Sequence, residues 1–204
     1  MSRLHTGVYA LLLIAFGLLC YLAHQLPGFP GDIAISLWLQ GIDLPFLNPI
    51  MQATSYISSL IPAIIIVALV AGGLWASGKR LEAIFVASLT SSAALFNWLL
   101  KLLISRPRPG NELNVLSFPS GHATYAVVFY GFLFYLTPRL VKQPLARSAL
   151  QSLLILLILL SGASRIYLGA HWPSDILGSL ILGGLLLAPT IALYRNYAKG
   201  QKRR

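Results

Sequence analysis

Residues 148–194 read SALQSLLILLILLSGASRIYLGAHWPSDILGSLILGGLLLAPTIALY, and this stretch decides the class of fold. Two apolar runs, 148–164 and 176–194, flank a short segment that holds Arg165, His171 and Asp175. A helix needs about 20 mostly apolar residues to cross the hydrocarbon core of a bilayer. Both runs come close to that length, so each is predicted to span a membrane, with the polar segment at the membrane surface.

The rest of the chain has the same character. Of its 204 residues, 57% are hydrophobic and 10% are charged, whereas an ordinary soluble domain has about 25% charged residues. So few charges cannot cover the surface of a water-soluble fold, which excludes that class. The fold is predicted to be all-α, a polytopic membrane protein with a single domain over residues 1–204. Six transmembrane helices are expected, at about residues 6–24, 55–76, 81–103, 122–136, 148–164 and 176–194.

The distribution of Lys and Arg predicts the orientation in the membrane. With the N-terminus in the cytoplasm, four of the 15 basic residues fall in outer segments, and the other eleven fall in inner segments. The four outer residues are Lys101, Arg106, Arg108 and Arg165. An excess of basic residues on the cytoplasmic side is typical of membrane proteins. We therefore expect a cell membrane location, a bacterial plasma membrane being favoured, with both termini cytoplasmic.

Net charge and cysteine content restrict the partners. The net charge of +10 would suit nucleic acid or an acidic lipid surface. Because the basic residues lie between and beyond the spans, membrane lipids are the expected partners, and neither nucleic acid nor an obligate protein partner is expected. The single cysteine, Cys20, excludes an intrachain disulfide and a cysteine-based zinc site.

The stretch 33–42 is predicted to form a short helix in the membrane interface.

Polar side chains gather at the outer ends of four predicted spans, where they can converge on one pocket. The three clusters are Lys101 with Arg108-Pro109, then Pro119-Ser120-Gly121-His122, then Ser164-Arg165 with His171 and Asp175. With neutral histidines, three basic side chains and one carboxylate give a net charge of +2, which matches a phosphate monoester dianion. A divalent cation would add two more positive charges, and Coulomb repulsion between like charges in a poorly solvated cleft would make its binding costly. We therefore expect no metal and no other cofactor.

Each cluster has a place in phosphate chemistry. Ser120 and Gly121 open a helix, where free N–H groups and a serine hydroxyl bind anions. Asp175 can accept a hydrogen bond from one ring nitrogen of His171, which leaves the lone pair of the other nitrogen free to attack phosphorus. His122 can donate a proton to the departing lipid oxygen.

Structural roles are the alternative for the same side chains. Ser120 and Gly121 also suit an ordinary helix start, and Asp175 also complements a helix N-terminus. Basic side chains near span ends also reach toward lipid headgroups. Arg106 has two interpretations, either a pair with Glu112 or a contact with a second phosphate.

The three clusters, in this order, resemble the signature of the type 2 phosphatidic acid phosphatase family, which shares its site with the vanadium haloperoxidases. The family pattern is Lys-x6-Arg-Pro, then Pro-Ser-Gly-His, then Ser-Arg-x5-His-x3-Asp, and residues 101–175 match it without departure. The resemblance implies a phosphohistidine on His171, oriented by Asp175, with His122 as acid and then as base for water. It implies that the phosphoryl oxygens are held by Lys101, Arg108, Ser120, Gly121 and Arg165.

The expected function is that of an integral membrane lipid phosphatase. An outward site fits undecaprenyl pyrophosphate in a bacterial envelope, and phosphatidylglycerol phosphate, phosphatidic acid and diacylglycerol pyrophosphate are alternative substrates. A lipid phosphotransferase would use the same phosphohistidine with a lipid acceptor. The six apolar spans argue against a soluble haloperoxidase. A non-enzymatic binder or transporter of anionic lipids would not need His122, His171 and Asp175 together.

Overall fold

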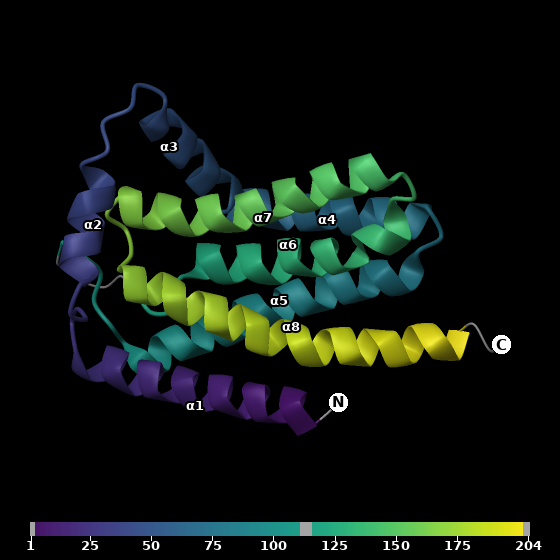
Figure 1. Cartoon of the computed structure of the whole chain (residues 1–204), viewed down its shortest axis with the longest axis horizontal. Coiled ribbons are helices and arrows are strands. Elements are labelled where there is room, and N and C mark those ends of the chain that lie inside the picture. Colours follow the sequence, from purple (N-terminus) through teal and green to yellow (C-terminus); the bar gives the residue numbers. More distant parts are fainter. Residues whose placement is uncertain (1–2, 111–115, 202–204) are drawn as a thin grey trace.

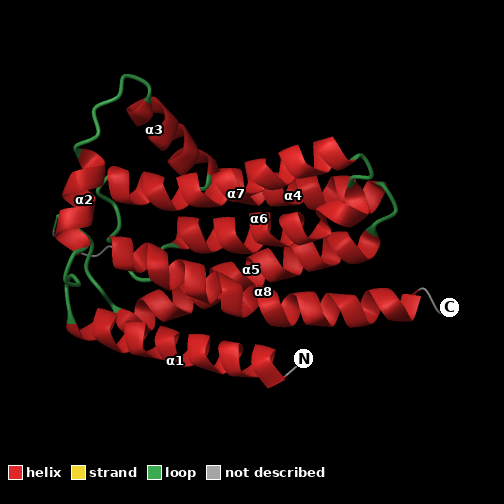
Figure 2. Ribbon diagram, viewed as in Figure 1, coloured by secondary structure: helices red, strands yellow, loops and turns green. Residues whose placement is uncertain are grey.

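The computed structural model describes residues 3–110 and 116–201, which form eight helices and no strand (Figure 1, Figure 2). In chain order the helices are α1 (Arg3–Gln25), α2 (Asp32–Gln40), α3 (Leu47–Ile57), α4 (Leu60–Ala76), α5 (Arg80–Ile104), α6 (Gly121–Leu140), α7 (Pro144–Tyr167) and α8 (Pro173–Gln201). The predicted all-α fold is confirmed for this part of the chain. The expected interfacial segment at 33–42 corresponds to the short helix α2.

Helix α6 lies in the middle of the bundle, packed against α5, α7 and α8 (Figure 1). Its side chains are mostly enclosed by these neighbours, and Phe129 and Leu136 are at most 1% exposed. Small residues allow the close packing. A Cβ at Gly183 of α8 would lie 2.4 Å from Cγ1 of Val127. An enclosed helix meets little lipid, which explains why α6 tolerates its many Tyr, Thr and Gly residues.

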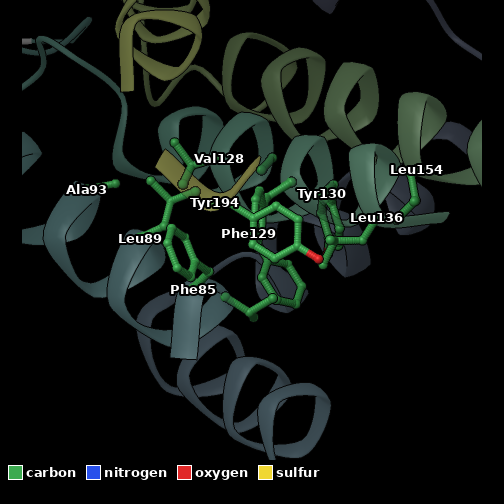
Figure 3. Close-up of a cluster of buried hydrophobic side chains, with 12 residues drawn as sticks. Phe85, Leu89, Ala93, Val128, Phe129, Tyr130, Leu136, Leu154 and Tyr194 are labelled. Carbon is green, nitrogen blue, oxygen red and sulfur yellow. The ribbon is translucent and has the colours of Figure 1, made fainter. Parts of the chain in front are cut away.

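An aromatic core packs α5, α6 and α8 together (Figure 3). The rings of Phe85 and Tyr194 meet edge to face with centroids 5.3 Å apart, and those of Phe132 and Tyr194 do so at 5.8 Å. Such pairs contribute about 0.5–1.5 kcal/mol beyond their buried area. The hydroxyl of Tyr194 donates to Glu82 at 2.7 Å, so its polar end is also satisfied.

Several helices meet the length and apolarity of membrane spans. Among the described residues, α1, α5, α7 and α8 are long and apolar enough to cross a bilayer, and α3 with α4 form a bent pair that would make a fifth span. The bend is 65°. The predicted second span, about residues 55–76, overlaps this pair, but its helix is interrupted at Ser58 and Ser59, and α4 begins at Leu60. The chain is a multi-pass membrane protein.

The two ends of the bundle differ. The start of α1 and the end of α8 lie toward the same end (Figure 1). The turn from α7 to α8 lies at the other end, beside α2 (Figure 1). That second end carries the polar clusters that the sequence singles out, and α2 is placed over it by contacts with α7 and α8.

Candidate active site

The turn between α7 and α8 positions His171 and Asp175. The backbone N–H of His171 donates to the carbonyl of Arg165 at 3.1 Å, which closes the end of α7. Pro173 opens α8, and its fixed φ angle suits a first helical position. Asp175 follows His171 by four positions in the sequence, and its Oδ2 is 3.2 Å from Nδ1 of His171. Both side chains are buried, at 1% and 0% exposure.

This geometry sets the tautomer and the charge of the His171 ring. With Nδ1 directed at the carboxylate, the lone pair of a neutral ring is on Nε2. Burial lowers the pKa of His171 to about 4, the Asp175 carboxylate opposes this shift, and the charges of Lys101 and Arg108 add to it. The imidazole is therefore neutral at pH 7, which a nucleophile requires.

Asp175 is held by more partners than the sequence suggested. Its Oδ2 also accepts hydrogen bonds from the backbone N–H of Trp172 at 3.0 Å and from the hydroxyl of Ser117. Its Oδ1 accepts from Nη1 of Arg106 at 2.6 Å. The sequence pattern did not point to Ser117, although it lies only two positions before the Pro-Ser-Gly-His cluster.

Arg106 has buried acidic partners that neither sequence interpretation named. Its guanidinium is fully buried and contacts Asp32 at 3.0 Å, as well as Asp175 and Ser174. Glu112 lies outside the described residues. Asp32 opens α2, and no motif pointed to it. The one available signal was weak: Asp32 is one of two acidic residues in a predicted outer loop that has no Lys or Arg of its own.

The segment before α6 is fixed from two sides. Nζ of Lys101 donates to the backbone carbonyls of Leu116 and Ser117 at 2.9 and 2.8 Å. On the other side, the hydroxyl of Ser179 donates to the carbonyl of Ser120 at 3.1 Å. These contacts place the N-terminus of α6, with Gly121 and His122, at the same end of the bundle as His171. An ammonium group has three N–H donors, so Lys101 keeps one for another acceptor.

Asn97 of α5 supports the same segment and was also missed. Its side-chain amide donates to Oγ1 of Thr124 at 3.0 Å and to the carbonyl of Pro119 at 3.4 Å. Asn97 is 4% exposed. Buried amides need such partners, and a single Asn within an apolar span was the available sequence signal.

Three of the predicted phosphate-binding side chains have buried donors without a partner among the described residues. These atoms are Nε of Arg108, Nε of Arg165 and Oγ of Ser120. Nη1 of Arg165 donates to the hydroxyl of Ser55 at the end of α3. Buried polar atoms normally have hydrogen-bond partners. Donors from three separate segments, two of them cationic, form a set typical of sites for a polyatomic anion.

The described residues include no group of three His, Cys, Asp or Glu side chains arranged to hold a metal ion. The acidic residue nearest to His171 is Asp175, and both of its oxygens already accept hydrogen bonds. Both carboxylate oxygens of Asp175 are thus already hydrogen-bonded to neighbouring side chains.

A cavity of about 620 Å³ lies between α4, α5 and α6 and reaches the candidate site. Small and apolar side chains line most of its length, including Ala63, Ala87 and Ala94. At one end it is lined by Asn97, Gly121 and His122. No pattern in the sequence indicated this cavity, since it forms only where three helices pack side by side.

Comparison with known proteins identifies the family of the chain. The chain matches the PAP2 superfamily over residues 81–199. Phosphatidylglycerophosphatase B of Bacillus subtilis (strain 168) is 30% identical over 164 residues, which cover 76% of this chain and 79% of that protein. Undecaprenyl-diphosphatase BcrC of the same organism is 31% identical over 132 residues, covering 59% of this chain and 63% of that protein.

A solved structure has the same architecture. The crystal structure of the first transmembrane PAP2 type phosphatidylglycerolphosphate phosphatase from Bacillus subtilis matches with a TM-score of 0.79 at 25% identity, over 92% of this chain and 96% of that one. Fold and relatives together define a membrane-embedded hydrolase of phosphate esters. The chain belongs to the PAP2 superfamily and is a membrane lipid phosphatase, as the sequence predicted.

Proposed function

We propose that this chain hydrolyses the terminal phosphate of a lipid phosphate or pyrophosphate through a phosphohistidine on His171, without a metal. The observation that carries the proposal is the buried His171–Asp175 pair, placed at the same end of the bundle as unpartnered donors of Arg108, Arg165 and Ser120. A nucleophile next to a set of anion-binding donors is the arrangement that phosphoryl transfer needs.

In the first step, Nε2 of His171 attacks phosphorus, and an N–P bond forms while the bond from phosphorus to the leaving oxygen breaks. Asp175 stabilises the proton on Nδ1 as positive charge develops on the ring. His122 gives its proton to the leaving oxygen, so that the lipid departs as an alcohol or as a monophosphate. Lys101, Arg108 and Arg165, with the N–H groups at the start of α6, stabilise the three phosphoryl oxygens.

In the second step, water replaces the histidine. His122, now without that proton, takes one from the water as the water attacks phosphorus. The N–P bond breaks, inorganic phosphate leaves and both histidines return to their starting states. With both histidines neutral, the net charge of the pocket is +2, and it is +3 while His122 carries the proton that it donates. Arg106 and Asp32 add one charge of each sign and leave these sums unchanged.

The cavity between α4, α5 and α6 supports a lipid as the substrate. It is mostly apolar and ends at His122, so a lipid chain in it would place its headgroup near the catalytic groups. The relatives narrow the headgroup, since one is named for phosphatidylglycerophosphate and another for undecaprenyl diphosphate. We propose these two lipids as the leading substrates, with phosphatidic acid and diacylglycerol pyrophosphate as further candidates.

For the membrane arrangement we propose six spans, one working domain, cytoplasmic termini and an outward active site. The sixth span would be α6, which is 20 residues long and lies among the other helices. The common end of the α1 start and the α8 end supports termini on one side. The excess of Lys and Arg in segments near that end supports a cytoplasmic location for it.

The function is tested by assaying purified protein against the four candidate lipids and measuring release of inorganic phosphate. We expect hydrolysis that EDTA leaves intact and that orthovanadate inhibits, because vanadate is an oxyanion able to become five-coordinate like phosphorus during transfer. Loss of activity in EDTA, restored by magnesium or zinc, would contradict the metal-independent mechanism. Transfer to an added lipid alcohol without phosphate release would identify a phosphotransferase.

Orientation is tested by cysteine labelling in intact cells. In a Cys20→Ala background, Asp43→Cys on the connection from α2 to α3 should react with an impermeant maleimide. Gln143→Cys, at the exposed start of α7, should react only after the cells are permeabilised. Both parent residues are exposed, so their access differs only by the side of the membrane. The opposite pattern would place the active site in the cytoplasm.

A further inference from the structure

Two buried charged residues lie next to the site and take no part in the steps above. Arg106 is 1% exposed and Asp32 is 3% exposed, and Nη2 of Arg106 lies 3.0 Å from Oδ2 of Asp32. Taking a guanidinium and a carboxylate out of water is costly unless both are well hydrogen-bonded. The contacts that offset this cost connect α2 to the catalytic carboxylate.

Asp32 holds the first turn of α8 although it belongs to α2. Its carboxylate accepts hydrogen bonds from the backbone N–H of Ser174 at 2.9 Å and from the hydroxyl of Ser174 at 2.6 Å. The backbone N–H of Phe29 donates to it at 2.8 Å. The first N–H groups of a helix have no acceptor within the helix. Asp32 therefore caps α8 from 142 residues away in the sequence.

Arg106 joins Asp32 to Asp175. Its Nη1 donates to Oδ1 of Asp175 at 2.6 Å and to the hydroxyl of Ser174 at 2.8 Å, while Nη2 donates to Asp32. Its guanidinium carbon lies 4.7 Å from the centre of the Phe29 ring. The planar fork of an arginine can engage two carboxylates at once, which a lysine cannot do in the same geometry. Because Arg106 holds Oδ1, the other oxygen of Asp175 faces His171.

We propose that Arg106, held in place by Asp32, is a positioning residue that aligns Asp175 with the nucleophile His171. The inference rests on the proposed phosphohistidine mechanism. Arg106 keeps Oδ2 of Asp175 on Nδ1 of His171, and its positive charge limits how strongly Asp175 draws a proton onto the ring. Asp32 balances that charge, so that the pocket stays suited to a phosphate dianion.

The charge of Arg106 makes the proposal testable through pH. The charged or titratable groups around His171 and Asp175 are Asp32 from α2, Lys101 from α5, Arg106 and Arg108 from the segment after α5, His122 from α6 and Arg165 from α7. Without Arg106, Asp175 would stabilise a protonated His171 more strongly. The ring would then lose its nucleophilic lone pair at a higher pH, and the acid limb of kcat/KM would move upward.

The experiment compares Arg106→Met, Arg106→Lys and Asp32→Asn with the wild type, each rate being divided by the amount of phosphohistidine that the sample can form. For Arg106→Met we expect kcat to fall at least about ten-fold with KM within about two-fold, and the acid limb to rise by about one pH unit. Arg106→Lys keeps the charge, so its acid limb should stay near that of the wild type. Asp32→Asn removes a negative charge, so its limb should not rise.

Three outcomes would overturn the inference. An unchanged acid limb in Arg106→Met would mean that Arg106 only cross-links helices. A raised KM with unchanged kcat would mean that it binds the substrate. An upward limb in Asp32→Asn would have the wrong sign, and this variant decides the matter if Arg106→Met does not fold. Absence of phosphohistidine in the active wild type would instead refute the proposed mechanism, and this inference with it.

Discussion

Replacement of His171 by Asn is expected to abolish both turnover and the covalent phosphoenzyme. The proposed nucleophile, Nε2, is lost, while a side-chain amide can still contact Asp175 at the position that Nδ1 of His171 occupies, 3.2 Å from Oδ2. Loss of a nucleophile removes the reaction path itself, so activity should fall below about 10⁻⁴ of the wild-type value. The measurement is phosphate release together with acid-labile, base-stable label transferred from substrate carrying a labelled terminal phosphate.

His24→Asn is the matched control for this variant. His24 lies on α1, and its Nδ1 is 3.0 Å from the carbonyl of Ile104, a contact that an asparagine amide can also make. We expect this variant to keep its activity and its labelled phosphoenzyme. Label that persists in His171→Asn would show that another residue is the nucleophile.

Replacement of His122 by Ala is expected to separate the two chemical steps. For a lipid monophosphate, loss of the general acid and base should slow both steps by the 10²–10⁴-fold (order of magnitude) that such groups usually contribute. A lipid pyrophosphate has a better leaving group, which needs less protonation. With this substrate, the loss of His122 should therefore slow the first step less than the second step, in which water still needs a base.

The consequence is that phosphohistidine should accumulate on His171 in His122→Ala with a pyrophosphate substrate. Rapid quenching with labelled substrate, followed by mapping of the labelled peptide, measures this accumulation. The wild type treated in the same way is the control and should show less label at steady state. Label found on His122 in the wild type would reverse the roles of the two histidines.

Much of the fold followed from local patterns in the sequence. Apolar length alone located the helices α1, α5, α7 and α8, because the cost of burying backbone groups in lipid requires a helix wherever such a run crosses a bilayer. The break within the second span, at two adjacent serines, was not predicted. Whether Ser58 and Ser59 continue a helix or break it depends on packing, since α3 packs against α7 and leaves α4 at an angle of 65°.

The candidate groups of the proposed site were named from the sequence, while the residues that contact and hold them were not. His171 and Asp175 lie four positions apart across a helix start, so a contact between them follows from local geometry. Ser117 and Asn97 assist only because separate segments meet at this end of the bundle. Serine occurs in many other places in the chain, so Ser117 carried no signal by itself, and the lone Asn of its span did not indicate which groups Asn97 would contact.

Residue type and short spacing were enough to predict that this protein crosses a membrane by helices and is a phosphatase. How the candidate groups are held depends instead on the packing of the helices. The Asp32–Arg106–Asp175 network joins residues 74 and 69 positions apart, and the cavity beside His122 needs three helices. Contacts between distant segments depend on how helices pack, which no local pattern specifies.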